Sequence, residues 1–156
     1  MTESSWATLC EQAPDVVSFG KSRIDGKVAY LSTVRSTGFP RTHPVTPIVG
    51  ESGCYLFAEP GSSKVRDFEL NKGFSLHCGM SDSSGSSGEF QMTGTVKLVT
   101  SEETRKAAEA ICSYRPAASY LLYELHIHEA VATAYRSGRP QRTRWVMDDA
   151  TAHAGS

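Results

Sequence analysis

The chain has 156 residues, the length of one ordinary domain and too short for two. Its 16 Lys and Arg side chains nearly balance 17 Asp and Glu side chains, which argues against binding to nucleic acids or to an anionic membrane surface. No apolar run is long enough to span a bilayer, and the amino terminus lacks the basic start and apolar middle of a signal peptide. We therefore expect a cytoplasmic protein.

The four cysteines are widely spaced and form no C-x-x-C pair, so the sequence indicates neither a zinc site nor a disulfide framework. We expect them to be reduced and mostly buried, because a free cysteine behaves as a small apolar residue. They are Cys10, Cys54, Cys78 and Cys112.

Residues 1–24 predict a helical lead-in to the body of the domain. Apolar residues recur at helical spacing before and after Pro14, which divides the segment into two short helices. From Lys27 onward the composition changes, and β-forming residues dominate.

Three β-rich runs, at 27–34, 41–49 and 54–59, are separated by turn residues and predict a three-stranded antiparallel meander. The middle run contains Pro44 and Pro47, which cannot donate hydrogen bonds to a neighbouring strand. We therefore expect this strand at an edge, at a bulge or at the opening of a barrel.

The middle of the chain predicts a short helix and then a hairpin. Its expected elements are a helix over 64–71, a strand over 74–80, a long Ser/Gly-rich hairpin loop over 81–89 and a strand over 90–99. Ser62 or Ser63 is the expected N-cap of the helix. Gly94 indicates a bulge or the close approach of another backbone.

A capping box formed by Thr100 and Glu103 predicts another helix, which reaches about Cys112. The residues expected on its inward face are Ala107, Ala108 and Ile111.

The strand expected over 120–136 carries the longest alternation in the chain. Its expected apolar face consists of Leu121, Tyr123, Leu125, Ile127, Val131 and Tyr135. A final strand is expected over 141–147, followed by a disordered tail over 148–156.

Six or seven strands with two or three helices, and no β-α-β alternation, predict a mainly β fold. We expect an antiparallel barrel with peripheral helices, forming a single domain over residues 1–147. The sequence contains neither a G-x-G-x-x-G motif nor a Walker-type loop, so a Rossmann domain is not expected.

An anion-binding site is indicated where Ser62, Ser63 and Lys64 join the end of a strand to the start of a helix. A helix amino terminus offers unpaired N–H groups and a partial positive charge, both of which favour a phosphate. Arg41 and His43 alternate along a neighbouring strand and share one face, so either could reach the same anion. The alternative is a capped surface helix with solvated cations.

Two further groups have alternative interpretations. His126 and His128 share a strand face and could ligate zinc or haem iron, or simply form a polar outer surface. Trp145, between Arg144 and the end of the last strand, could cover a planar ligand or anchor that strand. No metal site is assigned, and no hydrolase motif or catalytic residue is identified.

Taken in order, three segments resemble the flavin-binding split-barrel superfamily, the pyridoxamine 5'-phosphate oxidase-like proteins. They are AYLSTVRSTGFPRTHPVTPIV, YLFAEPGSSKVRDFELNKGFSLHC and EFQMTGTVKLV. The resemblance extends from Val28 to Trp145 and implies a six-stranded split barrel that dimerises, with two FMN molecules at the subunit interface.

The resemblance also implies the residues that contact the cofactor. The phosphate would be held by Ser62, Ser63 and Lys64, with help from Arg41 or His43. The isoalloxazine ring would lie against the backbone of Val45, Thr46, Pro47, Ile48, Phe57 and Ala58. Glu89 stands where the oxidase has a flavin-contacting glutamine from the partner chain, and Trp145 is a further candidate.

The carboxy-terminal residues GRPQRTRWVMDD lack the substrate-binding arrangement of true pyridoxamine phosphate oxidases, so vitamin B6 oxidation is not expected. The leading hypothesis is a homodimeric FMN oxidoreductase that transfers hydride or electrons to or from an unidentified small molecule. One alternative is a reductase that uses a deazaflavin cofactor on the same fold. The other is a flavin-binding or haem-binding protein without turnover.

Overall fold

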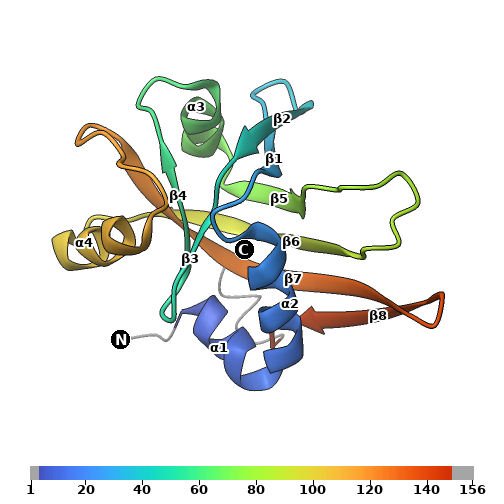
Figure 1. The fold of residues 1–156 in the computed structure, drawn as a ribbon. Helices are drawn as coiled ribbons and strands as arrows, with labels where there is room; N and C mark the ends of the chain where they lie inside the picture. The colour runs from blue at the N-terminus through green and yellow to red at the C-terminus, as the bar shows by residue number, and fades with distance from the viewer. Residues whose placement is uncertain (1–3, 149–156) are drawn as a thin grey trace.

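The computed structural model describes residues 4–148 as one curled antiparallel sheet with four helices (Figure 1). The helices are α1 (Ser5–Gln12), α2 (Pro14–Ile24), α3 (Ser63–Leu70) and α4 (Glu102–Ile111). The strands are β1 (Ala29–Val34), β2 (Pro40–Val45), β3 (Ile48–Val49), β4 (Cys54–Ala58), β5 (Gly73–Cys78), β6 (Glu89–Leu98), β7 (Leu121–Arg136) and β8 (Arg139–Val146). The mainly β barrel architecture expected from the sequence is confirmed.

The strand order shows why the sheet must curl. It runs β2-β1-β5-β6-β7-β4-β3, with β8 added alongside β7. β2 and β3 lie at opposite ends of this order, yet only Thr46 and Pro47 separate them in the chain. Because so short a connection spans only about 10 Å, the two ends of the sheet must come together there. The result is a barrel with a seam between β2 and the β3–β4 pair.

Helix α3 lies at the top of this seam, between β4 and the β1–β2 hairpin (Figure 1). Its Val65 and Phe68 side chains are buried in the core, and the Phe68 ring lies 5.1 Å from that of Tyr123 on β7. The helix therefore fills the seam with apolar side chains while its amino terminus remains near the surface.

The expected meander over residues 27–59 is wrong. The run 41–49 is two strands, because it breaks at Pro47, and β2 pairs only with β1. β4 pairs with β3 and β7 instead of β2. The break raises the number of strands among the described residues to eight, compared with the six that the resemblance implied. The edge position expected from the two prolines is confirmed for β2.

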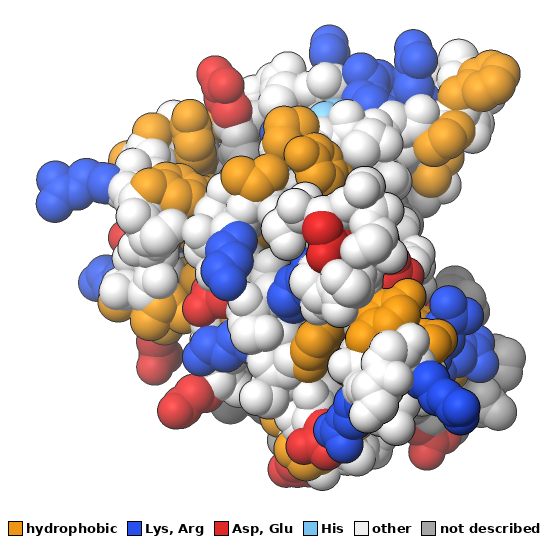
Figure 2. Space-filling view, turned by 45° about the vertical axis from the view of Figure 1, so that its right-hand side comes forward, with side chains coloured by type: hydrophobic (Ala, Val, Ile, Leu, Met, Phe, Trp, Pro, Cys, Tyr) orange, Lys and Arg blue, Asp and Glu red, His pale blue; other side chains and the backbone are white. Residues whose placement is uncertain are grey.

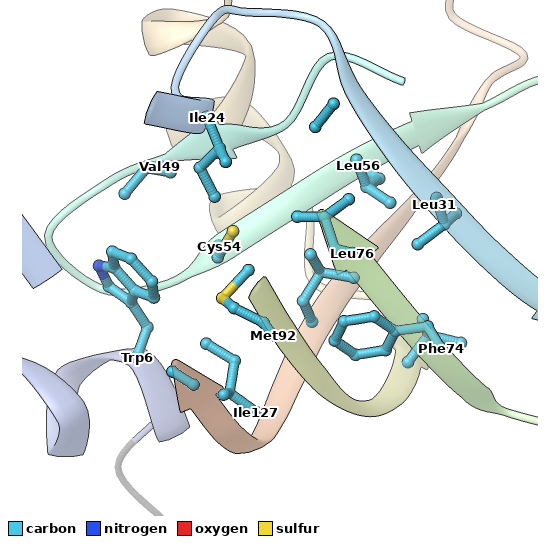
Figure 3. Packing of buried hydrophobic residues seen from close by; sticks show 14 of the residues in the cluster. Trp6, Ile24, Leu31, Val49, Cys54, Leu56, Phe74, Leu76, Met92 and Ile127 are labelled. Atoms are coloured by element: carbon cyan, nitrogen blue, oxygen red, sulfur yellow. The ribbon is translucent and has the colours of Figure 1, made fainter. Parts of the chain in front are cut away.

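The core lies inside the curled sheet, and its end opposite α3 is closed by α1 and α2 (Figure 1), as the close-up of the core side chains in Figure 3 shows from within. Side chains from both the helices and the strands point toward one another there, including Trp6, Ile24, Leu76 and Ile127. Ser5 supports this packing, because its hydroxyl accepts a hydrogen bond of 2.8 Å from the Ile127 N–H. Ile127 lies where β7 changes partner from β4 to β8, so α1 satisfies a donor that neither strand reaches.

β7 changes its inward face at a bulge. Gly94 of β6 pairs with Ile127, but the preceding Thr93 pairs with Glu129, so His128 is the extra residue. Beyond it, Ala130 and Ala132 are the buried residues. The expectation that Val131 and Tyr135 continue the inward face is therefore wrong, because one inserted residue reverses the alternation.

Helix α4 differs from its expectation in two details. Its N-cap is Ser101, whose hydroxyl accepts from the Thr104 N–H at 3.2 Å, and not Thr100. Only Ala108 of the expected inward face is buried, because the helix rests against the outside of the barrel, and Ala107 and Ile111 are exposed. Residues 149–156 of the expected tail lie outside the described part of the chain.

The cysteines fit their expected role as thiols, with Cys54 and Cys78 buried and Cys10 and Cys112 half-buried. No helix in the described range 4–148 has the length and apolar character needed to cross a membrane.

A methyl group at Gly94 tests the bulge. A Cβ at this position would lie 1.9 Å from the His126 carbonyl oxygen, which is backbone and cannot rotate away. We expect Gly94→Ala to lower the free energy of unfolding by about 3 kcal/mol in urea denaturation. Gly73→Ala is the matched control, because its Cβ would meet only the Asn71 side chain, at 3.1 Å. Equal losses in the two variants would contradict the close approach.

Candidate functional site

The start of α3 is set by a tight turn over residues 59–62. The Ser62 N–H donates to the Glu59 carbonyl at 3.1 Å, with Pro60 and Gly61 in the two central positions. Gly61 has φ +89°, the left-handed conformation that the third residue of a type II turn requires. The turn directs the chain straight from β4 into the helix.

Ser62 is the N-cap of α3, but its side chain does not cap. Its carbonyl accepts the first helical hydrogen bond, from the Arg66 N–H at 3.2 Å, while its hydroxyl makes no bond to the helix. The Ser62 Oγ atom is buried and has no partner among the described residues. A buried hydroxyl without a partner costs free energy, and together with the free N–H groups of the first helical turn it makes this position a candidate for anion binding.

Cationic side chains gather near this position. Arg41 and His43 lie two residues apart on β2. Lys64 of α3 lies close enough to them for its positive charge to lower the pKa of His43. Figure 2 shows Lys and Arg side chains grouped at the top of the molecule, at the height of α3 and the β1–β2 hairpin in Figure 1. None of the salt bridges among residues 4–148 involves Lys64. The three residues that the sequence placed near one anion therefore do lie close together.

A buried carboxylate fixes two of these basic side chains, Arg41 directly and His43 through Thr33. Asp67 of α3 is 4% exposed, and its Oδ2 accepts hydrogen bonds from Thr33 Oγ1 at 2.6 Å and Arg41 Nε at 3.1 Å. Thr33 Oγ1 also lies 3.0 Å from His43 Nε2. The network joins α3 to β1 and β2, and neither Asp67 nor Thr33 was predicted from the sequence. The signal in the sequence that could have revealed Asp67 was an ionisable residue beside the apolar positions of a short helix.

The network fixes the tautomer of His43. The single proton of the Thr33 hydroxyl is donated to Asp67, so Thr33 can only accept from the imidazole. His43 Nε2 must therefore carry a hydrogen, and its Nδ1 is unprotonated when the ring is neutral. Burial lowers the pKa of His43, and the positive charges of Lys64 and Arg41 lower it further against the opposing effect of Asp67. The lowered pKa favours the neutral form of the ring.

The seam beside this position leaves backbone groups unpaired. Val45 ends β2, which has no strand on its seam side, and Thr46 continues along that edge. Across the seam, residues 56–58 pair only with β7. Pro47, Ile48, Phe57 and Ala58 are buried. The Phe57 ring lies under the Arg105 guanidinium of α4 at 5.2 Å, so only its backbone is near the seam.

Two of the residues expected to contact the cofactor, Glu89 and Trp145, lie away from the start of α3 in the fold. Glu89 begins β6 at the hairpin loop, where its Oε2 is 3.7 Å from His77 Nε2. Trp145 is 7% exposed, and its indole N–H donates to Gln12 Oε1 at 2.8 Å. The hydrogen bond of Trp145 anchors β8 to α1, which is the second of the two roles expected for this residue. Within one chain, neither residue joins the α3 site.

His126 and His128 lie together on the outer side of the barrel. Their rings meet edge to face at 5.2 Å, and His128 Nε2 is buried without a hydrogen-bond partner in the described range. Burial lowers the pKa of His126, and the neighbouring His128 lowers it further. No cluster of three or more metal-ligating side chains occurs among residues 4–148.

The fold is that of the split-barrel pyridoxamine 5'-phosphate oxidase-like proteins. A haem-binding protein from Mycobacterium smegmatis superimposes with a TM-score of 0.65 at 15% identity, over 92% of this chain. This chain spans only 59% of that protein's length. No model of a known protein family matches the sequence, and neither does any curated protein.

Two other solved structures have similar folds. A NimC/NimA family protein from Clostridium acetobutylicum has a TM-score of 0.62 at 15% identity, over 85% of this chain and 92% of its own. A Listeria innocua protein, provisionally assigned as a pyridoxamine 5'-phosphate oxidase, has a TM-score of 0.62 at 14% identity. That alignment covers 76% of this chain and 95% of the other. These similarities confirm the fold that the sequence resemblance implied.

The protonation of His43 is directly measurable. We expect its pKa to lie below the ordinary value of 6.5 and to rise in Lys64→Gln, because that variant removes a positive charge near the ring. NMR titration of the imidazole nitrogens measures both values. Lys106→Gln, on the exposed face of α4, is the matched control and should leave the pKa of His43 unchanged. Equal shifts in the two variants would contradict the proximity of Lys64.

Because the pKa of His43 is lowered in the folded state, the unfolded chain binds more protons between the two pKa values. This residue therefore contributes stability that is present above about pH 6.5 and is lost as the pH falls through the folded pKa.

Proposed function

We propose that this chain binds FMN through its phosphate at the start of α3 and works as a flavin-dependent oxidoreductase on a small molecule. The observation that supports this most is the buried Ser62 Oγ without a partner, beside the basic side chains of Lys64, Arg41 and His43. We further propose that the protein is cytoplasmic and, as the sequence resemblance implies, homodimeric.

The donors present suit a phosphate dianion. Ser62 offers an unused hydroxyl, the first turn of α3 offers N–H groups, and Lys64 supplies a full positive charge. Asp67 contacts Arg41 through Nε, so the two terminal guanidinium nitrogens remain available to an anion. Neutral His43 can take up a proton and add another positive charge. The Asp67 carboxylate positions Arg41 rather than facing the anion, because Asp67 is buried.

The seam suits the ring of the same cofactor. Its unpaired backbone along residues 45–46 and 56–58 offers N–H and C=O groups to the polar edge of a planar heterocycle. A bound flavin would supply the hydride and electron chemistry, and the chain would bind the phosphate, orient the ring and exclude water. A deazaflavin cofactor also carries a phosphate and would use the same helix start.

Haem binding is a second candidate, supported by the unpartnered His128 Nε2 beside His126. Similar folds include the haem-binding protein from Mycobacterium smegmatis and a haem storage protein from Vibrio cholerae. An imidazole nitrogen without a hydrogen-bond partner is available as an axial iron ligand.

Lys64→Ala tests the phosphate site. We expect at least tenfold weaker binding of FMN, because the variant loses a charge-assisted contact worth about 1.5 to 3 kcal/mol. Fluorescence quenching of FMN measures the Kd. Riboflavin, which lacks the phosphate, should bind the wild type weakly and be unaffected by the substitution. An unchanged Kd for FMN would exclude this phosphate site, and the same titration with the deazaflavin cofactor distinguishes the two flavins.

Ser62→Ala separates binding from folding. The native hydroxyl is buried without a partner, so its removal should leave the melting temperature of the cofactor-free protein unchanged or higher. Binding of FMN should weaken severalfold. A lower melting temperature with unchanged FMN affinity would show that the hydroxyl serves the fold instead.

His128→Ala tests the second candidate. If haem is the ligand, the wild type should give a Soret band of a histidine-ligated haem, and the variant should lose it. His77→Ala is the control, since His77 lies on β5 and hydrogen-bonds to the Cys78 carbonyl at 2.7 Å. A spectrum unaffected by His128→Ala would remove the argument for haem at this histidine.

A further inference from the structure

A cavity of about 660 Å³ lies between the β5–β6 loop and the β7–β8 hairpin, outside the α3 site. Its size is typical of a small-molecule pocket. In Figure 1 both segments extend to the same side of the barrel, away from α3 and α4. In Figure 2 they come toward the viewer, with Lys and Arg side chains at the lower right. Within one chain, this cavity is separate from the α3 start and the seam, to which the function proposed above is assigned.

The sheet register builds the floor of the cavity. Thr133 of β7 pairs with Glu89 of β6 on one side and with Arg142 of β8 on the other. Directly paired residues point to the same face of a sheet, so a carboxylate, a hydroxyl and a guanidinium stand in one row. All three residues line the cavity. We call this row the Glu89–Thr133–Arg142 row.

The central hydroxyl of the row has no partner. Thr133 is 5% exposed, and its Oγ1 is buried without a hydrogen bond among the described residues. Gly88 contributes to this burial, because its backbone lies so close to the Thr133 carbonyl that a Cβ would come within 2.4 Å of the oxygen. A buried hydroxyl with no partner destabilises the fold, unless a ligand provides the missing hydrogen bond.

The roof of the cavity is held in place by hydrogen bonds. Arg23 of α2 donates from Nη1 to the carbonyls of Ser87 and Gly88, and from Nη2 to that of Gly79. Within the loop, the Asp82 carboxylate accepts from the Gly85 N–H and from Ser86 Oγ, both at 2.9 Å. The loop thus has a defined conformation over the row.

The charges at the two ends of the row remain largely uncompensated. Among residues 4–148, Arg142 forms no salt bridge, and Glu89 has only the 3.7 Å contact with His77. The Asp82 carboxylate is already engaged by the loop. Neighbouring strands lie about 4.8 Å apart, so the Cα atoms of Glu89 and Arg142 are roughly 10 Å from each other, across Thr133.

We propose that this cavity binds a small zwitterion, whose protonated amine pairs with Glu89 and whose carboxylate or phosphate pairs with Arg142. A polar group between the charges, or the charged groups themselves, would satisfy Thr133. A purely anionic ligand would face the carboxylate of Glu89, and a purely cationic one would leave Arg142 unpaired. All residues that line the cavity belong to one chain.

The probe for this site is 6-aminohexanoate, a flexible zwitterion whose methylene chain separates the amine from the carboxylate, so that its two ends can turn toward Glu89 and Arg142, whose Cα atoms are roughly 10 Å apart. Isothermal titration to the purified protein should show binding. Hexanoate and hexylamine, each lacking one charge, should bind at least tenfold more weakly. Glu89→Gln and Arg142→Gln should each weaken binding of 6-aminohexanoate at least tenfold. Arg139→Gln, on the same hairpin but outside the cavity lining, should not change it.

Thr133→Val distinguishes a ligand-binding role of the Thr133 hydroxyl from a purely structural one. The substitution removes the unpartnered hydroxyl at nearly constant volume, so we expect a higher melting temperature together with severalfold weaker probe binding. Thr133→Ser, which keeps the hydroxyl, should restore binding. Absence of 6-aminohexanoate binding at 10 mM (about 2.7 kcal/mol of standard free energy), equal binding of hexanoate, or binding unaffected by all three row substitutions would each overturn the proposal.

Discussion

The buried carboxylate of Asp67 is the interaction on which the proposed site depends. It accepts hydrogen bonds from Thr33 on β1 and Arg41 on β2, and it belongs to the helix that fills the seam. Through Thr33 it also sets the tautomer of His43. A buried charge must be paired to be tolerated, so this one carboxylate fixes α3 against both strands and holds Arg41 and His43 at the helix start.

The seam has both a structural and a functional consequence. Thr46 and Pro47 carry the chain from one end of the strand order to the other, which curls the sheet without closing it. An open sheet edge is a liability in solution, and α3 covers part of it with Val65 and Phe68. What remains uncovered is unpaired backbone beside a helix amino terminus. A ligand with a polar planar ring and a phosphate would match both features.

Unsatisfied polar atoms mark the places where this fold has stability to gain from a ligand. Among the described residues, only Ser62 Oγ, His128 Nε2 and Thr133 Oγ1 are buried side-chain polar atoms without partners. Each lies in a different region: the start of α3, the outer face at the β7 bulge, and the cavity beneath the β5–β6 loop. Most buried polar groups in proteins are hydrogen-bonded, so these three atoms are the natural positions to test for binding.

The sequence by itself determined the local features: the alternating strands, the α3 start, the bulge at Gly94, and the group of Ser62, Lys64, Arg41 and His43. These follow from residue spacing and turn chemistry within a few positions. Only the tertiary structure decided that 41–49 divides between two ends of the sheet, that Asp67 is buried, and that Glu89, Thr133 and Arg142 form one row. Those facts depend on strand pairing between distant segments, which no short-range pattern encodes.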